Sequence, residues 1–490
     1  MTYAEAIQFL YGLRLFGLKL GLENTLKLAE LAGNPHQKLR FIHVAGTNGK
    51  GSTCAMLESI YRAAGLRVGL FTSPHLVSFR ERIQVDRSLI SEADVVRLVG
   101  ELKDQIERAW PKPEAAAAKF SLRHGRDAAD RSAGFQPASS TGIPARSPTP
   151  GGTDAARTCT QDACATTQDA CATLPTFFEV VTVIALRYFV ERKCDLVIWE
   201  TGMGGRLDAT NIVTPLASVI TNIHFDHQKW LGNTRAEIAA EKAGIIKPGV
   251  PVITAADAPE ALEVIERTAA KLNAPLSKVG QASRLPTAAA LPLLGEHQKL
   301  NAALAIATVR VLQNKISVGD ESIRRGLETV QWPGRLQLIK TKSGQAILLD
   351  GAHNPDGARA LRAALLDELG HLVNRRDACA TLVFGVLADK DWPLMCETLA
   401  PLAGRILLAP VHSERTASPD ALREACAKSN PAAQTIACSS LADALKLSAR
   451  DPFVVITGSL YLVGEAMELL ELSPAASASE RELNEWTMKK

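Results

Sequence analysis

Long apolar runs are missing from this sequence. No stretch approaches the roughly 20 apolar residues that a membrane-spanning helix needs, and the opening segment MTYAEAIQFL lacks the basic region of a signal peptide. The formal net charge of +3 at pH 7 is too small to favour nucleic acid or a membrane surface as a partner. We therefore expect a cytoplasmic protein that binds neither nucleic acid nor a membrane. Its 490 residues are enough for two or three domains.

Cysteine pairs with a recognisable spacing are missing as well. Nine cysteines are present, but none forms a C-x-x-C pair or a zinc-binding pattern. Cys164, Cys171 and Cys379 lie in three copies of one pentapeptide, DACAT, and the rest are scattered. Because disulfides are rare in the cytosol, we expect reduced thiols without a functional role.

Large aliphatic residues are scarce between residues 113 and 175. Ala, Thr, Ser, Pro and Gly dominate there, and the heptapeptide TQDACAT occurs twice in tandem. Such a segment cannot bury enough apolar surface to offset the entropy lost on ordering. It is predicted to be a disordered insertion without chemistry, and segments 375–381 and 280–290 are interpreted as smaller intrusions.

The remaining sequence alternates between strand-like and helix-like segments. Short apolar runs predict strands within 39–46, 66–73, 194–200, 217–223, 250–256, 346–354, 380–391, 405–411 and 453–459. This alternation indicates an α/β fold of parallel sheets with helices packed on their faces. Trp332-Pro333-Gly334 marks the expected hinge, giving domains 1–331 and 332–490.

Polar residues collect where the predicted strands end. The segments are AGTNGKGS, TSPHL, WETGMGGRLDATN, TNIHFDH, LLDGAHN and ITGSLY. In open α/β sheets, ligands bind just beyond the carboxyl ends of the strands. Six strand ends of this composition therefore indicate one shared site.

The segment HVAGTNGKGST resembles a phosphate-binding loop but departs from the Walker spelling. Anchored on Lys50, that pattern would need glycine at Val44 and a hydroxyl at Gly51. Between a strand and a helix, Gly46 and Gly49 would let the backbone turn and present N–H groups to phosphate oxygens. A tight turn with a surface lysine is the alternative, and the spacing alone leaves both open.

The wider set of motifs resembles one family. AGTNGKGST, TSPHL, TFFE, GGRLDATN, DHQKWLG, EKAGIIKPG, HQKLNAALA, WPGR, DGAHNPDG, LADKD and GSLYL follow one another over nearly the whole chain outside the insertions. In this order they are similar to folylpolyglutamate synthase and the bifunctional dihydrofolate synthase, a branch of the Mur-type ligases. The resemblance implies a P-loop-containing Mur-ligase-type ATPase domain followed by a smaller Rossmann-like α/β domain.

The resemblance also implies an ATP-dependent amide synthesis. The γ-phosphate activates a carboxylate as an acyl phosphate, and the amine of L-glutamate attacks it. The carboxylate belongs to dihydropteroate in one activity and to the glutamyl tail of reduced folates in the other. This chemistry needs neutralised phosphate charge, two Mg²⁺ ions by family analogy, and a site poor in water. We expect a monomer.

Family roles carry over to matching positions. ATP binding is implied for Thr47, Asn48, Gly49, Lys50, Gly51, Ser52, Asn301, Arg335 and Asp350. Magnesium binding is implied for Ser52, Ser73, Glu179, His227 and Lys242. Without the family, Ser73 would be interpreted as a turn hydroxyl and Glu179 as a charge on a helix face.

Lys242 has the most unusual implied role, since the corresponding lysine is carbamylated by CO₂. The amine must be neutral to react, which burial and nearby positive charge favour. The alternative is an exposed helix lysine paired with Glu237 or Glu241.

The remaining implied roles concern the acceptor and glutamate. Arg82, His353 and Ser459 would bind substrate, with Asn354 close by. Lys50, Lys242, Asp350 and His353 would form the catalytic set. His353 could instead be a capping residue, and His43 and His224 are interpreted as structural.

Two other functions remain open at this level. One is a Mur-type ligase acting on a cell-wall or polymer precursor, which TFFE and GGRLDATN argue against. The other is a nucleotide-binding protein that the insertions have deprived of ligase activity, although every expected site residue is present. A further departure is the shortened, low-complexity segment 279–294.

Overall fold

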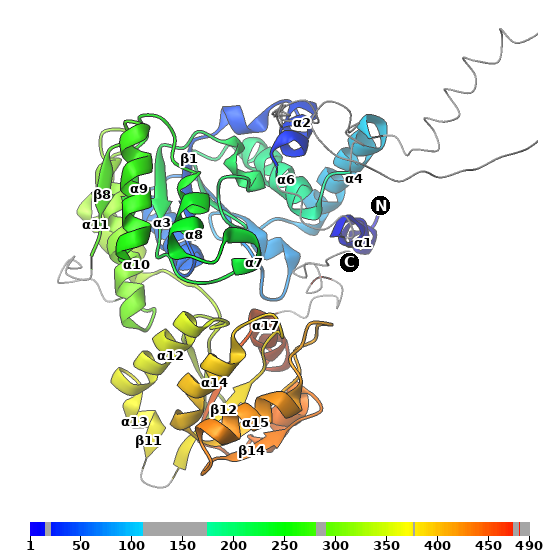
Figure 1. Ribbon diagram of the computed structural model, residues 1–490. Helices are drawn as coiled ribbons and strands as arrows, with labels where there is room; N and C mark the ends of the chain where they lie inside the picture. Colours follow the sequence, from blue (N-terminus) through cyan, green and yellow to red (C-terminus); the bar gives the residue numbers. More distant parts are fainter. Residues whose placement is uncertain (15–20, 111–173, 281–290, 376–377, 474–479, 481–490) are drawn as a thin grey trace, which may run out of the picture. The chain divides into compact units, whose positions relative to one another are not determined.

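The computed structural model describes residues 1–14, 21–110, 174–280, 291–375, 378–473 and 480 (Figure 1). The chain forms two compact units, residues 1–103 together with 175–490, and residues 104–174. Most of the second unit, and with it nearly all of the predicted insertion at 113–175, lies outside the described residues. The predicted intrusion at 280–290 also falls there, apart from Gly280.

The first sheet has eight strands in the order β4-β3-β2-β5-β1-β6-β7-β8. Their bounds are β1 (Phe41–Ala45), β2 (Val68–Phe71), β3 (Ile83–Val85), β4 (Ser88–Leu89), β5 (Leu196–Glu200), β6 (Ala217–Ile220), β7 (Val252–Thr254) and β8 (Leu276–Lys278). β2, β5, β1, β6, β7 and β8 are mutually parallel, whereas β3 and β4 add antiparallel pairings at one edge. Every residue of β1, β2, β5 and β6 is buried, as expected for parallel strands covered on both faces.

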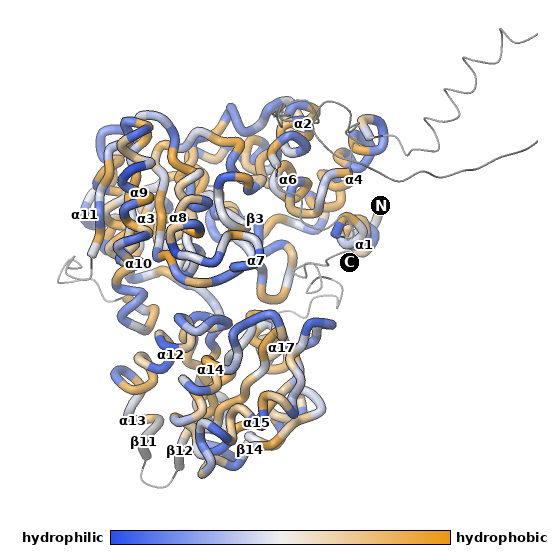
Figure 2. Tube along the Cα trace, viewed as in Figure 1, coloured by the Kyte–Doolittle hydropathy of each residue, from blue (hydrophilic) through white to orange (hydrophobic). Residues whose placement is uncertain are grey.

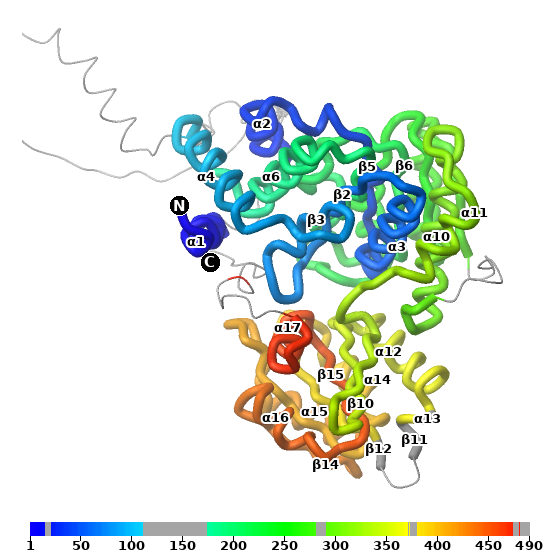
Figure 3. The backbone as a smooth tube through the Cα atoms, turned by 180° about the vertical axis from the view of Figure 1, so that it is seen from behind, coloured from blue at the N-terminus to red at the C-terminus, as the bar shows by residue number. Residues whose placement is uncertain are grey.

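Helices pack on this sheet and on one another; α1 and α2, for example, pack on α6. They are α1 (Tyr3–Leu13), α2 (Glu23–Leu31), α3 (Lys50–Ala63), α4 (Glu92–Ala109), α6 (Phe177–Glu191), α7 (Gln228–Leu231), α8 (Arg235–Ala243), α9 (Pro259–Lys271), α10 (Glu296–Val311) and α11 (Asp320–Glu328). α3 packs against both α10 and α11 (Figure 3), and α8 packs against α9 (Figure 1). Figure 2 shows hydrophobic and hydrophilic residues alternating along these helices, as expected where one face of each is buried.

The second sheet has the order β14-β13-β12-β15-β10-β9, with β11 paired to β12. Its strands are β9 (Gln337–Lys340), β10 (Ala346–Leu349), β11 (Asn374–Arg375), β12 (Ala378–Phe384), β13 (Ala403–Leu408), β14 (Gln434–Ala437) and β15 (Phe453–Thr457). β9 pairs antiparallel with β10, and β11 pairs antiparallel with β12. The other neighbouring strands are parallel. The helices are α12 (Pro355–Asp367), α13 (Gly370–Val373), α14 (Trp392–Leu399), α15 (Pro419–Ser429), α16 (Leu441–Leu447) and α17 (Leu460–Leu469).

The predicted two-domain α/β fold is confirmed, and each predicted strand overlaps an observed one. Residues 330–336, the predicted hinge, form turns and coil between α11 and β9. Within the segment 375–381, which the sequence suggests as an intrusion, residues 378–381 form the start of β12. None of the described helices is long and apolar enough to cross a membrane.

Candidate functional site

The loop between β1 and α3 is a cradle that only glycine can form. A Cβ at Gly46 would lie 1.7 Å from Oγ1 of Thr221, and one at Gly49 would lie 2.4 Å from Oδ1 of Asn301. Both glycines have positive φ, 151° and 84°, which side chains rarely tolerate. The loop ends at the N-terminus of α3, where unpaired backbone N–H groups and the helix dipole favour an anion. These features fit a phosphate group.

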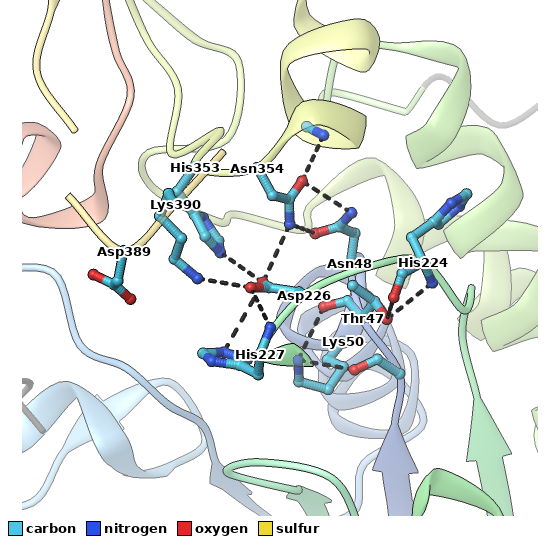
Figure 4. Close-up of polar contacts among 12 residues, drawn as sticks. Thr47, Asn48, Lys50, His224, Asp226, His227, His353, Asn354, Asp389 and Lys390 are labelled. Carbon is cyan, nitrogen blue, oxygen red and sulfur yellow. Dashed lines mark hydrogen bonds and ion pairs between the residues drawn. The ribbon is translucent and has the colours of Figure 1, made fainter. Parts of the chain in front are cut away.

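Neighbouring strand ends hold the loop in place (Figure 4). The backbone N–H groups of Thr47 and Asn48 donate to Asn222, at 2.9 and 2.8 Å. The Oγ1 hydroxyl of Thr47 donates to the carbonyl oxygen of His224 at 3.1 Å. The Nζ of Lys50 folds back onto the loop and donates to the carbonyl oxygens of Gly46 and Thr47, at 3.2 and 3.1 Å. Lys50 therefore contacts the cradle itself.

Lys242 is buried beside the same loop. Its side chain lies in α8, is only 4% exposed as a residue, and donates from Nζ to the carbonyl oxygen of Gly46 at 2.7 Å. Burial, followed by the positive charge of Lys50, lowers the pKa of Lys242 to about 7. The alternative of an exposed lysine paired with Glu237 or Glu241 is therefore wrong.

The acidic neighbours of Lys242 are engaged elsewhere. Glu237 accepts from the backbone N–H groups of Asn233 and Thr234, which places it at the N-terminal cap of α8. Glu241 pairs with Arg206 at 2.8 Å. Neither carboxylate is directed at Lys242 by these contacts.

Glu200 is a buried carboxylate beside Ser73 that was not selected from the sequence. It ends β5, is buried, and its Oε2 accepts from the backbone N–H of Ser73 at 3.0 Å. Burial raises its pKa to about 7, opposed first by the charge of Lys50. The available signal was its place at a strand end in WETGMGG.

Glu179 has a structural role at the start of α6. Its Oε2 accepts from the backbone N–H of Thr176 at 2.7 Å, and the Thr176 hydroxyl accepts from the Glu179 N–H in return. This capping box satisfies two helix-end donors. Its predicted magnesium role stays a prediction.

Asp226 is the centre of a polar cluster (Figure 4). Its Oδ1 lies 2.7 Å from Nζ of Lys390, and both side chains are 10% exposed. Its Oδ2 accepts from Nδ2 of Asn354 at 3.3 Å and lies 3.7 and 3.9 Å from Nε2 of His353 and His227. Burial opposes ionisation, but Lys390 and the two histidines hold the pKa of Asp226 well below its usual range.

This cluster also reaches the glycine loop. Asn354 Nδ2 donates to Oδ1 of Asn48 at 3.0 Å, while Asn354 Oδ1 accepts from the N–H of Gly357 and caps α12. The Nδ1 of His353 lies 2.8 Å from the carbonyl oxygen of Gly351. The DGAHN segment thus contacts both Asp226 and the loop, and the capping role belongs to Asn354 rather than to His353.

Asp350 organises the turn after β10. Its two oxygens accept from the backbone N–H groups of Leu336 and Ala352, at 2.9 and 3.0 Å. Burial raises its pKa, and the charge of Arg335 opposes this rise. Asn301 is buried in α10 against Gly49 and donates to Gln298. Each of the predicted nucleotide contacts thus lies near the loop or near Asp350.

Arg82 and Ser459 have local partners. Nε of Arg82 donates to Nδ1 of His75 at 2.8 Å, and its guanidinium lies 5.4 Å from the ring centre of Phe177. Burial lowers its pKa to about 10. Ser459 is the N-cap of α17 and accepts from the N–H of Tyr461.

His43 and His224, the two histidines interpreted as structural, differ in their surroundings. His43 is fully buried with Nε2 2.9 Å from Oγ1 of Thr210, which agrees with a structural role. His224 contacts Asp356 of α12, with Nδ1 2.8 Å from Oδ2. Among the residues that the structure describes, no three His, Cys, Asp or Glu side chains form a ready metal-binding group.

Comparisons with known proteins agree with this geometry. Residues 334–460 match the Mur ligase, glutamate ligase domain. The dihydrofolate synthase/folylpolyglutamate synthase of Bacillus subtilis is 34% identical over 96% of this chain and 99% of its own length. The structure of folylpolyglutamate synthase from Thermotoga maritima has a TM-score of 0.72 at 28% identity, covering 98% of this chain and 99% of that chain. Escherichia coli FolC in complex with DHPP and ADP has a TM-score of 0.73 at 27% identity, covering 96% and 98%.

The fold and the site define an ATP-dependent ligase of the Mur type, with a glycine cradle on one sheet and a glutamate ligase domain around the other. Within that class, the chain belongs to the folylpolyglutamate synthase/dihydrofolate synthase family. It is therefore a ligase that adds glutamate to folates. The alternative of a cell-wall or polymer ligase is not supported.

Proposed function

We propose that this chain carries both activities of its family, joining L-glutamate to dihydropteroate and to reduced folates. The observation that carries the proposal is the glycine cradle, with Lys50 and Lys242 beside it and Asn354 of the second sheet bonded to Asn48. Such a site can hold a triphosphate next to two amines and next to residues of the glutamate ligase domain. The E. coli relative bound to DHPP and ADP supports the dihydropteroate arm.

The loop residues bind ATP in this proposal. Thr47, Asn48, Gly49, Gly51 and Ser52 offer N–H groups or hydroxyls, and Lys50 neutralises the transferring phosphate. Lys50 would have to exchange its present bonds to Gly46 and Thr47 for phosphate oxygens, a rotation within the reach of a flexible side chain. Asn301, Arg335 and Asp350 complete the nucleotide site.

Magnesium fits the oxygen-rich side of the loop. Ser52 follows the cradle, and Ser73 and Glu200 are already bonded to each other at the end of β5. Hydroxyl and carboxylate oxygens suit this ion, which when bound would neutralise phosphate charge. We add Glu200 to the proposed ligands Ser52, Ser73, Glu179, His227 and Lys242.

Carbamylation of Lys242 is part of the proposal. A pKa of about 7 leaves a large neutral fraction at physiological pH, and only the neutral amine can react with CO₂. Intact-protein mass spectrometry at pH 8 with bicarbonate should show an adduct that is lost on acidification. Lys242→Met is the control, and an equal adduct on that variant would refute the assignment.

The remaining residues would bind the acceptor and glutamate. Arg82, stacked on Phe177, would meet the acceptor, while His353 and Ser459 would meet glutamate or the acyl phosphate. The burial of Asp226 and Lys390 limits water near the reacting groups, which protects an acyl phosphate from hydrolysis.

The proposal is tested by ADP release from the purified full chain. With L-glutamate present, dihydropteroate and tetrahydrofolate should each stimulate release, and a cell-wall nucleotide precursor should not. EDTA should abolish release and excess Mg²⁺ should restore it. Lys50→Ala should lower kcat by about 100-fold or more, since one preorganised charge contact at a transferring group contributes roughly 3–4 kcal/mol.

Stimulation by only one acceptor would reduce the proposal to that activity, and stimulation by neither would refute it. Turnover of Lys50→Ala within about threefold of the parent would remove Lys50 from the phosphate site. We further propose a monomer in the cytoplasm, which sedimentation of the purified chain and cell fractionation would test.

A further inference from the structure

Glu58 is a buried carboxylate on α3 that the proposed reaction does not use. Its side chain is 0% exposed, and its Oε1 accepts from Nε of Arg62 at 2.8 Å. Its Oε2 lies 3.9 Å from Nε of Arg87. Burying a carboxylate is costly unless cations compensate it, so the position of these arginines is important to the fold around α3.

Arg87 lies at the tip of the hairpin between β3 and β4. Asp86 and Arg87 both adopt the left-handed region, with φ of 50° and 68°, which is costly for residues other than glycine. From this turn, Nη2 of Arg87 donates to the carbonyl oxygen of Gln331. Its guanidinium carbon lies 5.9 Å from the ring centre of Trp332. Arg87 therefore joins α3 to the segment that connects the two sheets.

Trp332 in turn packs on the glycine loop. A Cβ at Gly51 would approach Cζ2 of Trp332 to 2.7 Å and Nε1 to 3.2 Å. Gly51 and Glu58 are seven residues apart in α3, about two turns, so they face the same side of the helix. Arg87 and Trp332 thus lie along one face of α3, one near its middle and one at its phosphate-binding end.

The connecting segment continues from Trp332 to a predicted nucleotide contact. Arg335 is three residues further on, and its Nη1 would be 2.2 Å from a Cβ placed at Gly351, next to Asp350. A shift of Trp332 away from Gly51 would therefore displace Arg335 as well. The segment has no helix or strand of its own between residues 330 and 336, so contacts with its neighbours must fix its course.

We propose that Arg87, paired with Glu58, is a positioning residue for ATP: it fixes Gln331 and Trp332 against Gly51 and thereby places Arg335 at the nucleotide. This rests on the proposed ATP site at the glycine loop. Arg87 acts through Trp332 and the backbone, without contacting the reacting groups. Its loss should weaken ATP binding selectively, because Arg82, the proposed acceptor contact before β3, is held by His75 and Phe177 rather than by this turn. The proposed glutamate contacts lie on other segments.

The test is a double-mutant cycle on the full chain with Arg87→Ala, Trp332→Ala and the combination. Each single variant should raise the KM for ATP and the Kd for the nonhydrolysable analogue AMPPCP by fivefold or more. KM for tetrahydrofolate and for glutamate should stay within twofold. The double variant should be no worse than about twofold beyond the poorer single variant, since both remove the same contact.

Arg324→Ala is the matched control. Arg324 also pairs with two carboxylates, Glu321 and Glu328, but on the exposed side of α11, so its loss should leave every KM within twofold. If Arg87→Ala does not fold, Arg87→Lys replaces it, because lysine keeps the charge but lacks the planar fork that lies beside Glu58 and donates to Gln331.

Three results would overturn the proposal: an unchanged Kd for AMPPCP in Arg87→Ala, a parallel rise in all three KM values, or additive effects in the double variant. These differ from a failure of the proposed function, in which the parent chain itself would release no ADP or bind no AMPPCP.

Discussion

Two separable features of the glycine loop between β1 and α3 require glycine: a positive φ and the lack of space for a side chain. Gly49 and Gly65 separate these causes, since φ is 84° and 89° but only Gly49 has an atom in the way, Oδ1 of Asn301 at 2.4 Å. Gly65, at the end of α3, has nothing within 4 Å. Gly65 is therefore a control for the cost of φ alone.

We expect Gly49→Ala and Gly65→Ala each to lose about 1 kcal/mol of unfolding free energy from the backbone. Only Gly49→Ala should also weaken AMPPCP binding, by tenfold or more, because the new methyl group displaces Asn301 and the loop. Urea unfolding and calorimetric titration would measure both. Equal effects of the two variants on binding would show that the cradle is not the nucleotide site.

His43 provides a prediction on pH. It is buried in β1, and burial lowers its pKa to about 3, from an ordinary value of 6.5. Between these values the unfolded chain binds a proton that the folded chain does not, so stability must fall as the pH falls. We expect the unfolding free energy to drop by up to about 1.4 kcal/mol per pH unit from this residue below pH 6.5.

His43→Gln keeps a polar atom near Oγ1 of Thr210 but does not titrate. Its unfolding free energy, measured by urea denaturation from pH 7 to pH 5, should therefore decline less steeply than that of the parent. Parallel curves would mean that His43 is not buried in its neutral form.

A site residue could be predicted from the sequence when its position is set by its neighbours along the chain. It could not when distant parts of the chain place it. The glycine loop is a local structure, so its residues could be selected from the sequence. Its spacing alone left a tight turn open, and the wider set of motifs was needed to favour a phosphate-binding loop. Lys242 also matched a motif, but its burial beside Gly46, 196 positions away, depends on the packing of α8. Glu200 was overlooked because only the pairing of β5 beside β2 brings it to Ser73.

At the level of elements, α16 and α17, the last two helices described, each begin with a serine whose hydroxyl accepts from a backbone N–H in the first turn. Ser459 accepts from the N–H of Tyr461 at 3.2 Å, and Ser440 accepts from the N–H of Asp443 at 3.1 Å. Loss of such a cap costs about 1 kcal/mol. The two serines therefore offer a matched pair, of which only Ser459 is a predicted substrate residue.

We expect Ser459→Ala and Ser440→Ala to lose similar unfolding free energy, about 1 kcal/mol each. Only Ser459→Ala should also raise the KM for glutamate, because its hydroxyl lies at the carboxyl end of β15. Steady-state kinetics with glutamate varied would decide. If both variants keep the parent's KM, Ser459 is a helix cap and nothing more.

Strands with a continuous run of apolar residues could be predicted from the sequence. Short strands with both polar and apolar residues could not. β1, β5 and β15 are buried throughout, and their apolar composition predicts them as strands. β4, β8 and β9 are short and partly exposed, so their composition does not distinguish them from loops. Their assignment depends on hydrogen bonds to a neighbouring strand, a property that no local pattern encodes.

At the scale of the whole molecule, Asp226 and Lys390 connect loops of the two sheets although 164 positions separate them. Neither was selected from the sequence, because the aspartate in FDH and the lysine in LADKD form a pair only when the fold brings them together. A neighbouring pair, Asp389 and Arg415, lies 3.5 Å apart but is 49% and 30% exposed. This second pair is a control on the same loop.

Removing Lys390 leaves a buried carboxylate without its nearest cation, which in buried pairs costs about 3–5 kcal/mol. We expect Lys390→Met to lose about 3 kcal/mol of unfolding free energy in EDTA, and Asp226→Asn added to it to recover much of that loss. The same cycle with Arg415→Met and Asp389→Asn should give a coupling below about 1 kcal/mol, since water screens exposed pairs. A coupling of that small size for Asp226 and Lys390 as well would mean that the pair is open to water in solution. The cluster at Asp226 could then neither link the loops of the two sheets nor keep water from an acyl phosphate.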